Sequence, residues 1–256
     1  MTIEYSGGGD PRRSLELLWG VQGRPKRGPK PKLTAEEIVR AAIGIADAEG
    51  LGALSMRRIA EDLGVSPMSI YTYVPGKAEL LDVMLDRAFG ELVPPAGEHG
   101  AWRARLEHIA RENWRLFHRH PWLLHVAIGR PPIGPHLLDK YEYELGAVEG
   151  LGLTDLEMDS VVALVTGFAE SSARAAVDAA LAERRTGTTD AEWWEATAPI
   201  LDEFVDSGRY PLGTRVGTAA GQEHQSAVAP EHAFEFGLQR VLDGIATLID
   251  SRAPAS

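Results

Sequence analysis

The sequence predicts an all-α protein with a three-helix helix-turn-helix domain at its N-terminal end and a larger helical domain behind it. Apolar side chains recur at the 3.6-residue spacing of amphipathic helices along most of the chain, and no stretch alternates as a strand does. Ser, Thr, Gly and Pro residues mark where these helices begin and end. With 256 residues, 44% of them apolar, the chain can bury cores for two small domains.

Composition excludes several classes of protein. The chain has no cysteine, so disulfide frameworks, thiolate zinc sites and cysteine nucleophiles are absent. The first residues lack the basic and apolar segments of a secretory signal, and no apolar run approaches the roughly 18 residues that a membrane helix needs. We therefore expect a cytoplasmic protein with no membrane partner.

Charge is distributed unevenly along the chain. The net charge is -11, but residues 1–95 carry 12 basic and 13 acidic side chains, whereas residues 96–256 carry 14 and 24. Between Gln22 and Leu33 there are five basic residues and no acidic one. Because local charge decides where a polyanion binds, the acidic total does not exclude DNA as a partner.

Residues 1–33 are expected to form a flexible basic arm, because their Gly, Pro and Lys content cannot build a packed core. Gly23-Arg24-Pro25 resembles the centre of an AT-hook, in which Arg enters the narrow minor groove of A·T-rich DNA. The alternative is a basic tail that contacts phosphates alone. Under both interpretations Arg24, Lys26 and Arg27 are candidate DNA contacts.

Residues 34–92 are expected to form the helix-turn-helix domain. Thr34 and Glu37 make a capping box before a helix that ends near Gly50. Ser55 caps a second helix that ends near Leu63, and Ser66 caps a third with Pro67 at its first position. A fourth helix is expected over about 77–92.

The two short helices around Gly64 carry the functional argument. Their expected shared core consists of Ile59, Ala60, Leu63, Val65, Ile70 and Val74. The outward face of the later helix offers Pro67, Met68, Ser69, Thr72 and Tyr73, without an acidic residue, so it can approach phosphates and base edges. An ordinary helical hairpin is the alternative. The basic arm upstream, and Lys77 at the start of the next helix, favour DNA binding.

The segment GLGALSMRRIAEDLGVSPMSIYTYVPGKAELLDVM resembles the N-terminal domain of the tetracycline-repressor (TetR) family over about residues 34–92. The Leu-Gly-Val turn, Ile-Tyr-Thr-Tyr and Gly-Lys-Ala-Glu-Leu-Leu carry this likeness. A looser resemblance to the C-terminal domain of the tetracycline-repressor subgroup rests on His120-Pro121-Trp122, Arg130 to Pro135, Gly167-Phe168 and Phe234 to Leu238.

The resemblance implies a homodimeric repressor that binds a palindromic operator in double-stranded DNA and is released by a small effector. It places Arg57 at a DNA-contacting position, Met68, Ser69 and Thr72 at base-facing positions, and Tyr71, Tyr73 and Lys77 at phosphate-contacting positions. Thr72 stands where the family commonly has a bulkier group, so the operator sequence is left open. For Tyr71 the alternative is packing in the core with a solvated hydroxyl.

A ligand-binding and dimerisation domain is expected over residues 101–250, after a break at Val93–Gly97. The resemblance implies that its helices near 154–185 and 230–250 pair with their symmetry mates, with Ala169, Ala173, Ala176 and Ala180 permitting close approach; the alternative is burial within one protomer. Ser207–Ala229 is expected to be a mobile loop that serves either as the lid of the ligand site or as its entry path. Further helices are expected near 101–118, 121–128, 134–150 and 190–206.

Five aromatic and imidazole side chains are candidates to line a central cavity. A flat, hydrophobic or aromatic effector would suit a cavity lined by Trp102, His108, Trp114, His118 and Trp122. The alternative is that these side chains pack in the core or lie on the surface. His118, His125 and His136 lack convincing metal-ligand spacing, so no metal or cofactor is expected. No nucleophile motif or phosphate loop is present, which argues against an enzyme. The alternatives are an enzyme domain fused to a helix-turn-helix and a ligand-independent architectural DNA-binding protein.

Overall fold

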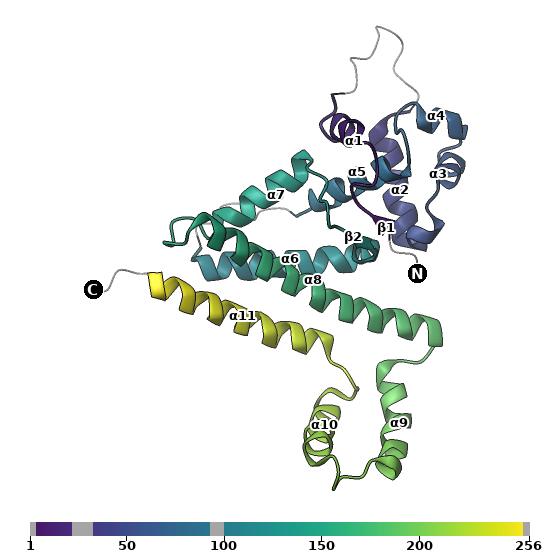
Figure 1. The fold of residues 1–256 in the computed structure, drawn as a ribbon. Coiled ribbons are helices and arrows are strands. Elements are labelled where there is room, and N and C mark those ends of the chain that lie inside the picture. Colours follow the sequence, from purple (N-terminus) through teal and green to yellow (C-terminus); the bar gives the residue numbers. More distant parts are fainter. Residues whose placement is uncertain (1–3, 22–32, 93–99, 253–256) are drawn as a thin grey trace.

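The structure is a computed structural model that describes residues 4–21, 33–92 and 100–252. Helices α2 to α5 form a small domain, α6, α7, α8 and α11 form a larger one, and α9 and α10 make a hairpin that projects from it (Figure 1). Over these stretches of chain, none of the helices combines the length and apolar character needed to span a bilayer.

The first elements are β1 (Glu4–Tyr5), α1 (Pro11–Leu18), α2 (Ala35–Glu49), η1 (Leu51–Ala53), α3 (Met56–Asp62), α4 (Pro67–Tyr71) and α5 (Lys77–Phe89). They are followed by α6 (Trp102–Arg119), η2 (Pro121–His125), β2 (Val126–Ala127), α7 (Pro135–Gly146), α8 (Asp155–Thr186), α9 (Asp190–Phe204), α10 (Pro211–His224) and α11 (Pro230–Arg252).

The small domain forms as the sequence predicts. The capping box at α2 is present: the Glu37 N–H donates to the Thr34 hydroxyl, and the Thr34 N–H donates to the Glu37 carboxylate. Gly64 turns the chain between α3 and α4 with a φ of +65°, a conformation that L side chains rarely adopt. Ile59, Ile70 and Val74 are each 0% exposed. Their burial fixes α4 against α3 and leaves the opposite face of α4 outside.

The N-terminal segment departs from the expected arm. β1 pairs in parallel with β2, and α1 packs along α5. Two carboxylates of α5, Glu79 and Asp82, are buried, and both accept hydrogen bonds from this segment. Asp82 accepts from the Gly7 N–H at 2.9 Å and the Ser14 hydroxyl at 2.8 Å, while Glu79 accepts from the Asp10 N–H at 3.1 Å.

A flexible arm is therefore wrong for residues 4–21. The physical reason is that buried carboxylates need donors, and this segment supplies them while Leu17 and Leu18 cover apolar surface. Within the predicted arm, Arg24, Lys26 and Arg27 lie outside the described residues, so their proposed DNA contacts stay predictions.

The larger domain has its own core between α6, α8 and α11. Leu106, Val165 and Leu238, one from each helix, are 0% exposed. The helix expected over 121–128 is instead the short turn η2 followed by β2, because the backbone at Val126 and Ala127 pairs with β1. Helix α7 packs against α5 and so joins the two domains.

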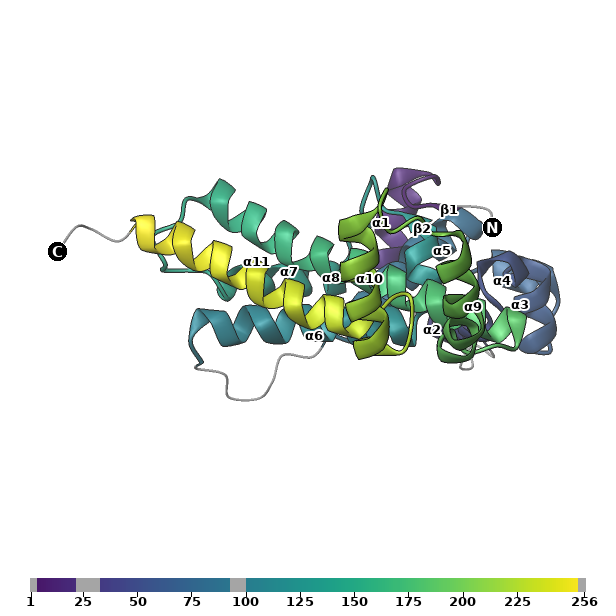
Figure 2. The same ribbon diagram turned by 90° about the horizontal axis from the view of Figure 1, so that it is seen from below.

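Two expectations about the larger domain are wrong. Ala169 and Ala173 are 0% exposed and Ala176 is 6% exposed, so these three pack inside their own protomer and are not available to a symmetry mate, whereas Ala180 is exposed. Ser207–Ala229 is not a continuous loop, because α10 occupies most of it. Gly221 of α10 faces α9, because a Cβ there would lie 2.4 Å from the ring of Trp194. The lack of a side chain at Gly221 therefore allows the two helices to pack closely. Figure 2, seen from below, shows the hairpin of α9 and α10 in front of the body from which it projects.

Candidate functional site

Helix α4 presents an exposed face beside the N-terminus of α5. Met68 is 74% exposed and Tyr71 is 46% exposed, so Tyr71 is not a core residue. Pro67 and Thr72 are also exposed, whereas Ser69 is half-buried and its hydroxyl lies 2.9 Å from that of Ser66. The face carries no acidic side chain, which suits it to a polyanion.

Thr72 and Tyr73 follow the last residue of α4 in a short turn. The Thr72 hydroxyl donates to the Met68 carbonyl oxygen at 3.3 Å, which orients its methyl group. Tyr73 is half-buried against the core of the small domain, so packing fixes its ring. The predicted base-facing and phosphate-facing side chains therefore lie together on and just after α4.

Arg57 and Lys77 flank this face and differ in how they are held. The hydrogen bond and charge of Glu61, 2.8 Å away, raise the pKa of Arg57, but the Arg57 side chain is 83% exposed and the pair lies in water. Such a pair is weak, which leaves Arg57 available to DNA. The Lys77 ammonium donates to the Glu4 carboxylate at 2.8 Å. Sequence reasoning missed this contact because Glu4 lay in the supposed arm.

A buried histidine joins the two domains near the end of α2. His120 is 4% exposed; its Nδ1 lies 2.7 Å from a carboxylate oxygen of Asp47 and its Nε2 lies 3.1 Å from one of Glu91. Burial opposes ionisation of Glu91, but hydrogen bonds from Arg119 and His120, with their positive charge, outweigh it and lower its pKa. The Trp122 indole N–H also donates to Asp47 at 2.9 Å.

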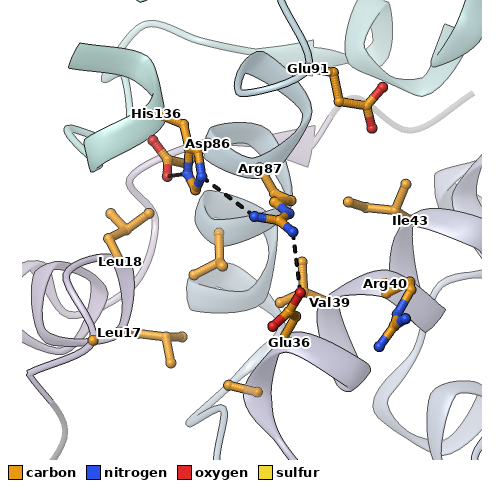
Figure 3. A pocket seen from close by; sticks show the side chains of 13 residues that line it. Leu17, Leu18, Glu36, Val39, Arg40, Ile43, Asp86, Arg87, Glu91 and His136 are labelled. Carbon is orange, nitrogen blue, oxygen red and sulfur yellow. Dashed lines mark hydrogen bonds and ion pairs between the residues drawn. The ribbon is translucent and has the colours of Figure 1, made fainter. Parts of the chain in front are cut away.

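A cavity of about 610 Å³ lies between α1, α2, α5 and α7 (Figure 3). Arg87 of α5 crosses it, donating to Glu36 of α2 at 3.2 Å and lying 3.5 Å from Nε2 of His136 on α7. The Nδ1 of His136 is 2.8 Å from Asp86, which is 3% exposed. This line of polar contacts connects the DNA-binding helices to the larger domain.

The five side chains predicted to line a ligand cavity do not form one site. Trp114 stacks on Phe234 with ring centroids 4.2 Å apart, and Trp102 packs against the core of the larger domain. The Nε2 of His108 is buried and has no hydrogen-bond partner among the described residues. His118 and Trp122 do line a common cavity, at the junction between the domains.

A polar cluster inside the larger domain was missed from the sequence. Asn113 and Glu144 are each 3% exposed, and the Glu144 carboxylate accepts from the Lys140 ammonium at 2.5 Å and the Asn113 amide at 3.2 Å. The signal was present, because Asn113 interrupts the apolar stripe of α6. A cavity of about 400 Å³ adjoins this cluster, lined by Phe89, Gly90, Leu92, His136, Asp139, Lys140 and Tyr143.

Two protein families match the chain. Residues 38–84 match the family described as "Bacterial regulatory proteins, tetR family", and residues 94–249 match "Tetracyclin repressor-like, C-terminal domain". The segment that contains β1 and α1 precedes both matches.

Similar full-length proteins are transcriptional repressors. The HTH-type transcriptional repressor DrrR1 of Streptomyces coeruleorubidus is 49% identical over 252 residues, covering 98% of this chain and 91% of DrrR1. The HTH-type transcriptional repressor Rv1353c of Mycobacterium tuberculosis is 26% identical over 238 residues, covering 91% and 88%.

Among solved structures, ActR from Streptomyces coelicolor in complex with actinorhodin superposes with a TM-score of 0.68. It is 28% identical and covers 86% of this chain and 99% of its own. The ActR complex with (S)-DNPA gives a TM-score of 0.67 at 28% identity, covering 85% and 98%.

Proposed function

We propose that this chain, which belongs to the TetR family of bacterial transcriptional regulators, represses transcription as a homodimer that binds a palindromic operator and is released by a small hydrophobic effector. Like its relatives, it is a transcriptional regulator and not an enzyme. The observation that carries the proposal is the acid-free, exposed face of α4, held by buried Ile70 and Val74 beside the start of α5. Its expected location is the cytoplasm, with the DNA.

The outer faces of α8 and α11 support the homodimer. Leu164 of α8 is 51% exposed and Phe236 of α11 is 60% exposed, and such large apolar side chains mark interaction surfaces. Small residues of α8 are exposed near Leu164 at Ala163, Gly167, Ser171 and Ala175. This stripe replaces the one expected from the sequence and allows the close approach of a second copy.

Leu164→Arg is expected to yield monomers, because a charge without a partner would enter an apolar interface. The unmodified protein should sediment as a dimer and protect a two-fold symmetric site with half-sites about 10 bp apart, set by one turn of DNA. The variant should lose the symmetric footprint. Leu15→Arg, at an exposed position on α1, is the matched control and should stay dimeric. A monomeric unmodified protein with an asymmetric footprint contradicts the proposal.

Glu4→Gln is expected to tighten operator binding about two- to fivefold, because it frees the Lys77 ammonium from a half-buried ion pair of modest strength. The slope of log affinity against log salt should steepen by up to about one phosphate contact. Fluorescence anisotropy over a salt series measures both. Glu16→Gln removes the same charge from a pair on α1 and should change little. The effect should vanish in a Lys77→Ala background; a gain that survives there points to a general charge effect instead.

The effector is proposed to bind beside the Asn113, Lys140 and Glu144 cluster. A buried ion pair contributes little to stability, so its presence next to a cavity is better explained by recognition of a polar group on a ligand. Phe89, at the end of α5, also lines the cavity, and α5 begins at Lys77, shortly after α4. A ligand that favours one position of α5 therefore shifts the spacing of the two DNA-binding domains.

Leu92→Trp is expected to abolish effector response while sparing operator affinity, because the indole would fill the cavity that Leu92 lines. Actinorhodin, which is bound in an ActR structure, is a suitable first aromatic probe. Operator release and tryptophan fluorescence are followed in the same titration. Leu212→Trp, on exposed α10, is the control and should respond as the unmodified protein does. Tight binding of the probe with unchanged operator affinity argues against this cavity as the switch.

A further inference from the structure

We propose a second small-molecule site, for a planar aromatic anion, in the cavity between the C-terminal end of α2 and the C-terminal half of α8. This cavity holds about 450 Å³, within the range of small-molecule pockets. One wall is the turn from α2 into η1, and the other is formed by the end of α6, η2 and α8. It shares no lining residue with the cavity beside Lys140, so it lies beyond the effector site proposed above.

The floor and sides of the cavity are apolar and partly aromatic. Trp122 is 1% exposed, and its indole N–H is fixed by Asp47, so the ring is held in one orientation. Pro121, Val177 and Leu181 complete the apolar lining. A rigid aromatic ring next to aliphatic side chains suits a flat ligand, because such a ligand can stack without ordering new protein side chains.

Among the described residues, the unpaired charged side chains at the rim of this cavity are basic. Arg184 and Arg185 are exposed, and neither has a hydrogen-bond or ion-pair partner among the residues that the structure describes. The two carboxylates of the lining are already bound: Asp47 to His120 and Trp122, and Glu49 to Arg58 at 2.8 Å. An acidic group on a ligand would therefore find two guanidinium groups without competing carboxylates.

Two imidazoles add polar contacts inside the rim. The Nδ1 of His118 lies 2.8 Å from the Trp114 carbonyl oxygen, to which an Nδ1–H donates, and Nε2 is left for a ligand. Burial lowers the pKa of His125 and the charge of Arg174 lowers it further, which together outweigh the opposing charge of Asp178. Imidazole rings can stack on an aromatic ring and bond to its hydroxyl or carbonyl groups.

Binding at this site would couple the two domains directly. The α2–η1 wall leads into α3 of the helix-turn-helix, whereas α8 carries the proposed dimer surface. A ligand that contacts both walls must stabilise one relative position of the domains over others.

The test is a titration of the full-length protein with 1-anilinonaphthalene-8-sulfonate, an aromatic anion, followed by its fluorescence. Saturable binding is expected, and Arg184→Ala/Arg185→Ala should weaken it about tenfold, the effect of losing a charged hydrogen bond. N-phenyl-1-naphthylamine, which lacks the sulfonate, should show no such dependence on the arginines. Ala180→Trp, which fills the cavity, should remove the arginine-dependent site.

Ala198→Trp is the matched control, because it places the same side chain in the groove between α9 and α10. It should retain the arginine-dependent binding, and imidazole NMR signals of His118 and His125 should shift on titration. The double arginine variant changes exposed residues alone, so its folding is not in question. Equal affinity for the sulfonate in the unmodified protein and the double arginine variant overturns the proposal, as does equal loss in Ala180→Trp and Ala198→Trp.

Discussion

Met68→Glu is expected to weaken operator binding by roughly a hundredfold or more, because like charges brought together at an interface cost several kcal/mol. Met68 lies on the exposed face of α4 and is 74% exposed, so the new carboxylate would face the phosphates and bases of the operator. The same exposure means that the substitution should leave the folded domain intact. Fluorescence anisotropy with an operator fragment measures the loss, and urea unfolding checks that stability is unchanged.

Met68→Gln separates charge from shape at the same position. It should lose much less affinity than Met68→Glu and should instead change which bases are preferred, since an amide can bond to base edges. Leu212→Glu introduces the same carboxylate on α10, where the side chain is 67% exposed. Because salt screens exposed charges that are far apart, operator affinity should stay within about twofold of that of the unmodified protein. If Met68→Glu binds as tightly as the unmodified protein, α4 does not enter the DNA.

The features that could be predicted are local ones. The capping box at Thr34 needs two residues three positions apart, and it forms as expected. The turn at Gly64 and the burial of Ile59 and Ile70 likewise follow from spacing within one short segment. The exposed face of α4 could therefore be predicted from the sequence, because burying one side of so short a helix determines which side remains exposed.

The features that could not be predicted depend on distant partners. Glu4 and Tyr5 pair with Val126 and Ala127, far along the chain, and neither strand is long enough to show alternation. Gly221 looks like a loop residue until Trp194 of the neighbouring helix is placed against it. Glycine content alone cannot distinguish a mobile segment from a closely packed helix.

The five candidate ligand residues do not gather at one cavity, for a similar reason. Along an amphipathic helix, aromatic side chains that pack in the core and those that line a cavity recur at the same spacing. Periodicity therefore cannot distinguish the two roles. Trp114 proved to be stacked on Phe234, whereas buried Asn113 donates to Glu144, the partner of Lys140 in the cavity wall. A polar residue within an apolar stripe is the more informative signal, because its burial needs a specific partner.

Deletion of residues 1–21 is expected to lower the free energy of unfolding by about 3 kcal/mol or more, taking about 1.5 kcal/mol for each of Leu17 and Leu18. Both leucines are 9% exposed, and the deletion would also remove the donors to Glu79 and Asp82. Urea unfolding followed by circular dichroism measures the change. If the urea midpoint does not move, this segment adds nothing to stability and behaves as a flexible arm does.

Ser14→Val isolates the hydrogen bond from the rest of the segment. It keeps α1 and its apolar contacts but leaves one oxygen of buried Asp82 without the hydroxyl donor at 2.8 Å, and it should cost about 1–3 kcal/mol. Ser14→Thr retains the hydroxyl and should stay close to the unmodified protein. In an Asp82→Leu background, which removes the buried charge, the cost of Ser14→Val should largely disappear, because the two residues act as one interacting pair. An equal cost in both backgrounds would assign the loss to packing at Ser14 and not to the carboxylate.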